Sequence, residues 1–178
     1  MNTMKRIIVI GPESTGKSTL CDHLAAHYQT VWCPEYAREY LLKNGMNYTY
    51  DDLTIIAQGQ LHLQASMAAK AQNNVYFVDT DMYVMKVWNE VAFSACPTWI
   101  LKTIAQTSCD LYLLCNTDLP WTKDELREYP DLATRQRLFK MYKDIVINSG
   151  MPWATVSGTD EERLHTAVAA VDSILTNK

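Results

Sequence analysis

The chain has 178 residues, of which 48% are hydrophobic and 20% charged, so its length and composition are those of one globular domain. Sixteen basic and twenty acidic side chains leave a net charge of −4, and no basic run exceeds a pair, which argues against a nucleic-acid partner. The five cysteines have no paired spacing, a pattern typical of reduced thiols. We therefore expect a cytoplasmic protein. The apolar run from Ile7 to Ile10 is too short for a signal peptide or a membrane span, so we expect neither. Whether the chain forms a homo-oligomer stays open.

Short β-type segments alternate with helical ones, which predicts an α/β fold with a parallel sheet. The expected strands are residues 4–10, 30–33, 75–78, 111–115 and 152–156. The expected helices are 17–28, 52–72, 82–91, 98–106, 137–148 and a last one that opens at a capping box, Thr159 to Glu162. No linker or internal repeat divides residues 1–178, so we expect a single domain.

Residues 117–135 are richer in charge than the rest of the chain and are interrupted by Pro120 and Pro130. The segment from Thr122 to Glu125 fits a capping box, which predicts a short charged helix in an exposed, mobile lid. Arg127 lies after the fourth strand, where an arginine that closes over a phosphoryl group would stabilise its charge. The alternative is an arginine that is merely solvated.

A phosphate-binding loop follows the first strand, because Gly11 to Ser18 matches G-x-x-x-x-G-K-[ST] without a gap. In such a loop the backbone N–H groups surround phosphate oxygens, Lys17 reaches the β- and γ-phosphates, and the Ser18 hydroxyl binds Mg²⁺. We expect ATP as the nucleotide, although the sequence does not distinguish it from GTP. The expected nucleotide-binding residues are Gly11, Glu13, Ser14, Thr15, Gly16, Lys17, Ser18 and Thr19.

Two classes of nucleotide-binding protein lack their usual signatures here. A GTP-dependent switch usually carries D-x-x-G and N-K-x-D, whereas this chain has Asp79-Thr80-Asp81-Met82 and Asn116-Thr117-Asp118-Leu119. A ring-forming ATPase usually has Glu beside its metal-site Asp, where Thr80 stands here. A small-molecule kinase remains the better interpretation, with a non-enzymatic nucleotide switch as the alternative.

Asp79 and Asp81 follow the third strand, at the edge of the sheet where ligands bind in α/β folds. Asp79 is the natural carboxylate for Mg²⁺, and its alternative role is to cap the next helix. Asp81 has two equally weighted roles, as a helix cap or as a substrate ligand that could serve as the catalytic base.

Glu35 follows the second strand at the same edge and is a candidate general base for a substrate hydroxyl. Arg38, one helical turn later, either meets substrate or forms a surface pair with Glu35. Gly59 lies inside the long helix, where glycine is unfavourable, so we expect a ligand or a close neighbour there. Gln60 shares the apolar face of that helix, and with Tyr36 it completes the candidate substrate residues.

With these motifs the chain resembles the NadR-like ribosylnicotinamide kinases over nearly its whole length. The resemblance rests on the phosphate loop, Glu35-Tyr36-x-Arg38-Glu39, Ala57-x-Gly59, Asp79-Thr80-Asp81, and the lid pattern Asn116-Thr117-x-x-x-Trp121 with Leu126-Arg127. It implies a P-loop NTPase fold in three α/β/α layers, with a five-stranded parallel sheet in the order 2-3-1-4-5 and a small helical lid. It also implies phosphorylation of the 5′-hydroxyl of nicotinamide riboside.

The loop begins ten residues into the chain, so the resemblance covers no DNA-binding or adenylyltransferase domain, and we expect neither activity. In the expected mechanism Lys17, Glu35, Asp81 and Arg127 are catalytic, and Ser18 and Asp79 hold Mg²⁺. Which of Glu35 and Asp81 is the base stays open. Another nucleoside or deoxynucleoside is the alternative substrate.

Overall fold

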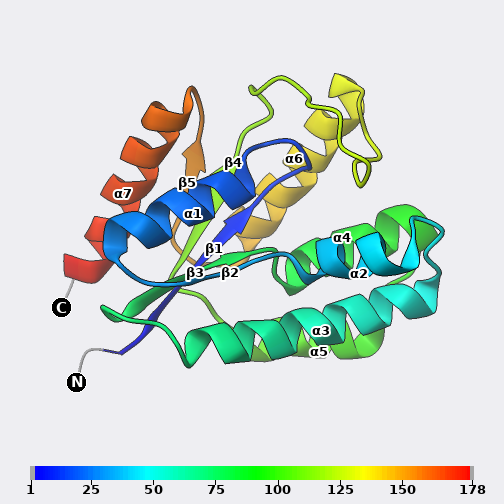
Figure 1. Ribbon diagram of the computed structural model, residues 1–178, viewed down its shortest axis with the longest axis horizontal. Helices are drawn as coiled ribbons and strands as arrows, with labels where there is room; N and C mark the ends of the chain where they lie inside the picture. Colours follow the sequence, from blue (N-terminus) through cyan, green and yellow to red (C-terminus); the bar gives the residue numbers. More distant parts are fainter. Residues whose placement is uncertain (1–2, 177–178) are drawn as a thin grey trace.

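A five-stranded parallel sheet forms the centre of the computed structural model, which describes residues 3–176 (Figure 1). The strands are β1 (Lys5–Ile10), β2 (Trp32–Cys33), β3 (Val75–Asp79), β4 (Leu111–Cys115) and β5 (Trp153–Val156). Their order is β2-β3-β1-β4-β5 and every neighbouring pair is parallel, which confirms the predicted fold. Residues 7–10, 75–79 and 111–115 are buried, because helices cover both faces of a parallel sheet.

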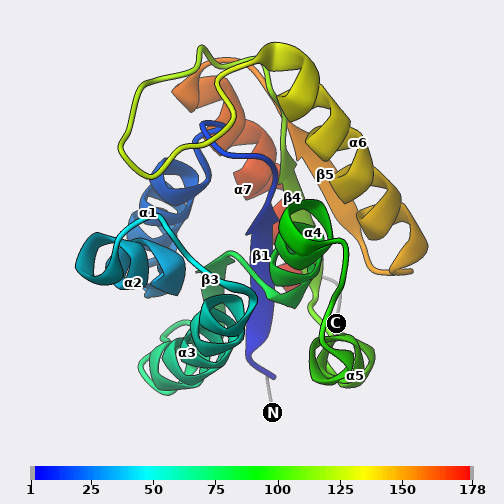
Figure 2. The same ribbon diagram turned by 90° about the vertical axis from the view of Figure 1, so that its right-hand side faces the viewer.

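The two faces of the sheet are covered by different helices. On one face α1 (Lys17–Tyr28) and α7 (Asp160–Thr176) pack on strand residues such as Val9 and Phe77. On the other face α4 (Met82–Phe93) and α6 (Leu132–Asn148) pack on Ile8 and Leu114. Figure 2 shows α1 and α6 on opposite sides of β1 and β4. These layers place the carboxyl ends of the strands beneath residues 117–131.

A third apolar cluster lies beside the sheet, where α2 (Tyr36–Asn44), α3 (Tyr50–Ala68), α4 and α5 (Thr98–Gln106) pack together. Gly59 lies in this cluster, and a Cβ atom there would come within 2.1 Å of the Tyr36 ring. The expected close neighbour is therefore an aromatic side chain of α2. This contact sets how closely α2, which follows Glu35, approaches α3.

The predicted lid helix is wrong, because residues 117–131 contain no helix. Asp124 instead accepts a hydrogen bond from the Leu126 amide, which forms a tight turn, and the Thr122 amide donates to Ser14. The bond to Ser14 occupies the Thr122 amide, which in a capping box would donate to the Glu125 side chain. The next helix, α6, begins at Leu132 rather than at 137, with Asp131 as its N-cap.

The boundaries of α3 differ from the expected ones, and the start of α7 agrees with expectation. The long helix α3 begins at Tyr50 after a capping box between Thr49 and Asp52, and it ends at Ala68 rather than at 72. The capping box at the start of α7 is present, because the Thr159 amide and the Glu162 carboxylate bond as predicted. No helix within residues 3–176 is both long and apolar enough to cross a membrane.

Candidate functional site

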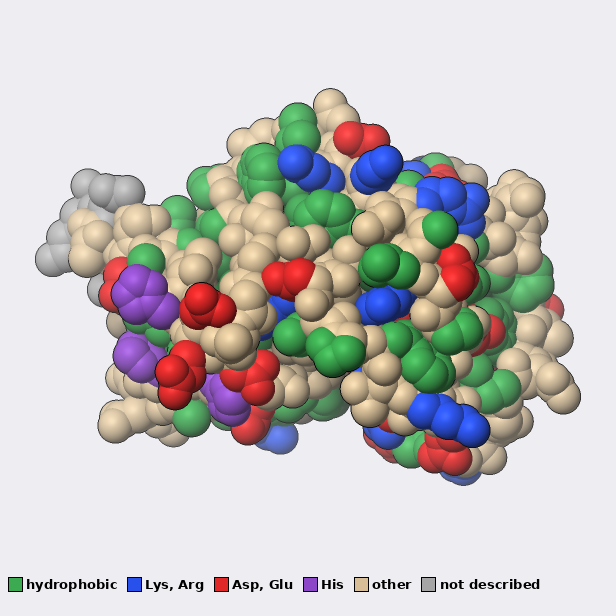
Figure 3. Space-filling view, turned by 90° about the horizontal axis from the view of Figure 1, so that it is seen from above, with side chains coloured by type: hydrophobic (Ala, Val, Ile, Leu, Met, Phe, Trp, Pro, Cys, Tyr) green, Lys and Arg blue, Asp and Glu red, His purple; other side chains and the backbone are tan. Residues whose placement is uncertain are grey.

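A cavity of about 480 Å³ opens at the carboxyl ends of the strands, between the phosphate loop, the lid and α4. Its volume suits a small ligand. Several segments line the cavity. They include the phosphate loop from Gly11 to Thr19, the end of β2 with Glu35 and Arg38, the α4 residues Val84, Val87 and Trp88, and the lid residues Asp124 and Leu126 to Tyr129. On the face seen from above, Lys and Arg side chains are interspersed with Asp and Glu (Figure 3).

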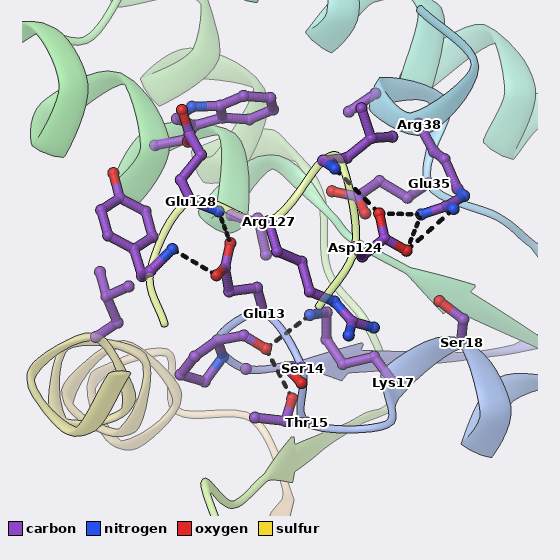
Figure 4. A pocket seen from close by; sticks show the side chains of 18 of the residues that line it. Glu13, Ser14, Thr15, Lys17, Ser18, Glu35, Arg38, Asp124, Arg127 and Glu128 are labelled. Carbon is purple, nitrogen blue, oxygen red and sulfur yellow. Dashed lines mark hydrogen bonds and ion pairs between the residues drawn. The ribbon is translucent and has the colours of Figure 1, made fainter. Parts of the chain in front are cut away.

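The phosphate loop has the closed geometry that its sequence predicts. Gly11 has a φ of +149° and approaches the backbone of β4 so closely that a Cβ would lie 2.8 Å from the Cys115 carbonyl oxygen. The Lys17 ammonium donates to the Pro12 carbonyl at 2.9 Å, and the Thr15 hydroxyl donates to the same oxygen at 2.7 Å (Figure 4). Lys17 therefore reaches back across the loop, where a bound phosphate would meet both its charge and the start of α1.

Ser18 and Asp79 form an oxygen pair beneath the loop. The Ser18 hydroxyl donates to Oδ2 of Asp79 at 2.5 Å, although the two residues come from α1 and β3. A hydroxyl and a carboxylate are hard oxygen donors, and Mg²⁺ in nucleotide sites takes only one or two such protein ligands beside water and phosphate. The pair therefore fits Mg²⁺. Asp79 does not act as the cap of α4, because Asp81 occupies that position.

Glu35 lies partly buried at the end of β2 and lines the cavity. Burial, together with the negative charge of Asp79, raises the pKa of Glu35 to about 7, against the opposing effects of Lys17 and Arg38. A carboxyl group with a pKa near neutrality is suited to accept a proton at physiological pH. This is the strongest candidate base in the cavity.

Asp81 and Gln60 are placed outside the cavity lining. Oδ1 of Asp81 accepts from the Tyr83 and Val84 amides, and Oδ2 accepts from the Tyr112 hydroxyl. Burial raises the pKa of Asp81, but both of its oxygens already have partners. The geometry favours the helix-cap role.

Gln60 holds together the backbone around the site. Its side-chain oxygen accepts from the Tyr36 amide at 2.7 Å, and its nitrogen donates to the Pro34 and Asp79 carbonyls, each at 3.3 Å. It is therefore placed to orient the ends of β2 and β3 rather than to touch a ligand. The Tyr36 ring likewise packs against Gly59 and is absent from the lining.

Arg38 and Arg127 both line the cavity, but they have different partners. The Arg38 guanidinium pairs with the Asp124 carboxylate of the lid at 3.2 Å, so it contacts Asp124 rather than Glu35 (Figure 4). The Arg127 guanidinium donates to the Thr122 carbonyl within the lid. Figure 4 shows the Arg127 side chain directed toward Lys17. The structure thus brings the lid arginine to the phosphate loop.

Two arginines are buried, which was not predicted from the sequence, where Arg135 counts only as a second lid arginine after Arg127. Arg163, only 2% exposed, donates to the carbonyls of Thr15, Gly158 and Asn116 and pairs with Asp118. It shares the buried face of α7 with Ala167 and Val171, and this helical spacing could have revealed its burial from the sequence. Arg135 of α6 is 4% exposed, and its Nε and Nη1 have no hydrogen-bond partner within residues 3–176.

Comparison with known proteins finds relatives in sequence. The trifunctional NAD biosynthesis/regulator protein NadR of Salmonella typhimurium is 26% identical over 162 residues, and the Escherichia coli protein of the same name matches equally well. These matches cover 88% of this chain but only 39% of each relative, so the chain spans well under half of their length.

Solved structures show the same fold. A NadR protein in complex with NR superimposes with a TM-score of 0.79 at 23% identity, covering 98% of this chain and 51% of the other. Thymidylate kinase from Ehrlichia chaffeensis superimposes with a TM-score of 0.63 at 12% identity, covering 98% and 100%. The family model described as an AAA domain matches residues 6–163, which is most of the chain. The chain therefore belongs to this AAA domain family (AAA_28).

Proposed function

We propose that this chain is a kinase that transfers the γ-phosphoryl group of ATP to the 5′-hydroxyl of nicotinamide riboside, giving nicotinamide mononucleotide and ADP. One observation carries the proposal: the phosphate loop, the carboxyl group of Glu35 and the guanidinium of Arg127 line the same cavity. Phosphoryl transfer to a hydroxyl needs a phosphate cradle, a group that orients or deprotonates the acceptor, and a cation for the transferred group.

Each of these residues has a role in the proposed reaction. The loop amides and Lys17 hold the β- and γ-phosphates. The acceptor oxygen bonds to the γ-phosphorus while its proton passes to Glu35, and the bond from that phosphorus to the β–γ bridging oxygen breaks to release ADP. Arg127 balances the charge on the transferring group. Mg²⁺ bound at Ser18 and Asp79 would neutralise phosphate charge.

The acceptor end of the cavity supports a flat, positively charged ring. Val84, Val87 and Trp88 line it, and the Trp88 indole donates to the Tyr48 hydroxyl at 2.9 Å. That hydroxyl lies 3.0 Å from the Glu128 carboxylate, which also lines the cavity. The nicotinamide ring of the riboside carries a positive charge, so it would gain from the aromatic Trp88 side chain and from the Glu128 carboxylate. A neutral nucleobase would gain only the stacking.

The relatives support the same acceptor and also define the alternatives. A NadR protein has been solved with NR bound, and this chain shares its fold. The fold is also shared, at the lower TM-score of 0.63, with thymidylate kinase, so another nucleoside or deoxynucleoside is the competing acceptor. A nucleotide switch without an acceptor is the third interpretation, and it would show slow ATP hydrolysis that no nucleoside stimulates.

The test measures ADP release from Mg-ATP with nicotinamide riboside, with each common ribo- and deoxynucleoside, and with no acceptor. We expect stimulation by nicotinamide riboside alone, and loss of that stimulation in Lys17→Ala. Glu35→Gln should lose turnover while retaining ATP binding, whereas Asp81→Asn should keep the same reaction if its role is to cap α4. Stimulation by another nucleoside would keep the kinase and refute the substrate. No stimulation by any acceptor would favour the switch.

A further inference from the structure

Two side chains of the phosphate loop hold the lid. The Glu13 carboxylate accepts from the backbone amides of Glu128 at 2.9 Å and Tyr129 at 2.6 Å, and from the Trp121 indole at 3.4 Å. The Ser14 hydroxyl oxygen accepts from the Thr122 amide at 3.0 Å. Figure 4 shows the bonds from the lid to Glu13 on the opposite side of Arg127 from the Asp124 pair. We call these contacts the loop–lid latch.

The latch holds the chain on both sides of Arg127. Thr122 precedes this arginine and is bound to Ser14, and Glu128 follows it directly and is bound to Glu13. The Arg127 guanidinium donates to the Thr122 carbonyl, so its side chain is tied to the same anchored peptide. Because the backbone is held at both points, the position of the guanidinium depends on Glu13 and Ser14.

We infer that Glu13 and Ser14 are positioning residues that hold Arg127 over the phosphate loop, and that their side chains bind the lid rather than the nucleotide. This inference rests on the proposed function for the catalytic role of Arg127. The latch itself stands on the hydrogen bonds alone. The backbone amides of both residues keep their expected role in the phosphate loop.

Electrostatics supports this role for Glu13. A carboxylate next to a triphosphate repels it, so Glu13 is a poor nucleotide ligand. Two backbone amides give that charge a geometrically defined partner, and bonds from N–H groups to a carboxylate are short and strong. The other lid anchor, between Arg38 and Asp124, has an arginine side chain that is 55% exposed, and such exposed pairs contribute little.

The kinetic test uses Glu13→Ala, with Glu125→Ala as the control because Glu125 is an exposed glutamate of the same lid. A catalytic group displaced by about 1 Å loses roughly 100-fold in rate, so we expect kcat to fall on that order in Glu13→Ala. The KM for ATP should stay the same or decrease, because a repulsive charge is removed. Glu13→Gln keeps one acceptor oxygen, so its kcat should lie between those of the unsubstituted chain and Glu13→Ala.

A double-mutant cycle separates positioning from a general structural defect. If Glu13 acts through Arg127, then Glu13→Ala combined with Arg127→Ala should be no slower than Arg127→Ala alone. Independent, multiplicative losses would overturn the inference. So would a large increase in the KM for ATP with kcat unchanged, since that result would make Glu13 a nucleotide ligand.

Hydrogen exchange tests the latch without any kinase assay. In the protein without substrates, the amides of Glu128 and Tyr129 should exchange faster in Glu13→Ala than in the unsubstituted chain or in Glu125→Ala. Unchanged exchange would overturn the latch whatever the substrate is. Faster exchange in a protein that no acceptor stimulates would keep the latch and refute the proposed function instead.

Discussion

The raised pKa of Glu35 makes a measurable prediction about stability. The carboxyl group has a pKa of about 7 in the folded chain, because of burial and the neighbouring Asp79, against a usual value of 4.5. Between these two pH values the folded chain holds a proton that the unfolded chain has lost. Stability therefore falls as the pH rises through this interval, and the full cost is present above pH 7.

Glu35→Gln removes this cost because the amide is neutral at every pH. The difference of 2.5 units between the folded and unfolded pKa lowers the free energy of unfolding by about 3 kcal/mol at pH 8. At pH 5 the loss is less than about 1 kcal/mol, because this pH is only slightly above the unfolded pKa of 4.5. We expect Glu35→Gln to be more stable than the unsubstituted chain at pH 8, with most of the gain absent at pH 5, while phosphoryl transfer is lost.

Urea unfolding at both pH values, without nucleotide or Mg²⁺, measures the difference. Glu39→Gln serves as the control, because Glu39 is an exposed glutamate on the same helix. A loss of stability in Glu35→Gln at pH 8, or a gain of equal size at both pH values, would refute the argument. The first result would mean that the carboxylate is held by favourable partners, and the second that its charge is not the cause.

Three further substitutions test the packing around the site, each by urea unfolding without nucleotide. Gly59→Ala places a Cβ within 2.1 Å of the Tyr36 ring. The cost of overpacking, about 1–3 kcal/mol, should exceed the gain of about 1 kcal/mol in helix propensity, so the chain should be less stable. An increase in stability would show that the ring moves freely. Arg163→Met loses the bond to the Thr15 carbonyl and its other buried partners, and should destabilise the chain by about 3–5 kcal/mol; a cost under about 1 kcal/mol would contradict this. Arg135→Met removes a buried guanidinium of which two nitrogens have no hydrogen-bond partner within residues 3–176. It should leave stability unchanged or raise it, and a clear loss would contradict this.

The local patterns in the sequence determined most of the fold. Buried parallel strands read as continuous apolar runs, and helices as apolar residues at helical spacing, so the alternation predicted the α/β class and nearly every element. The phosphate loop was equally clear, because its chemistry depends on residues that are adjacent in the chain. The order of the sheet came from the family resemblance, since the partners of a parallel strand lie far apart in sequence.

Only the tertiary structure decided how the site is connected. The sequence predicted a helix at Thr122. Glu13 and Ser14 lie more than 100 residues away and bind backbone amides of this segment, which is not helical. In the sequence, a helix cap is an alternative role for both Asp79 and Asp81. The structure assigns the cap to Asp81, which accepts from an amide of α4, and leaves Asp79 bound to the Ser18 hydroxyl. Such contacts join distant segments, so hydrophobic periodicity and local propensity contain no record of them.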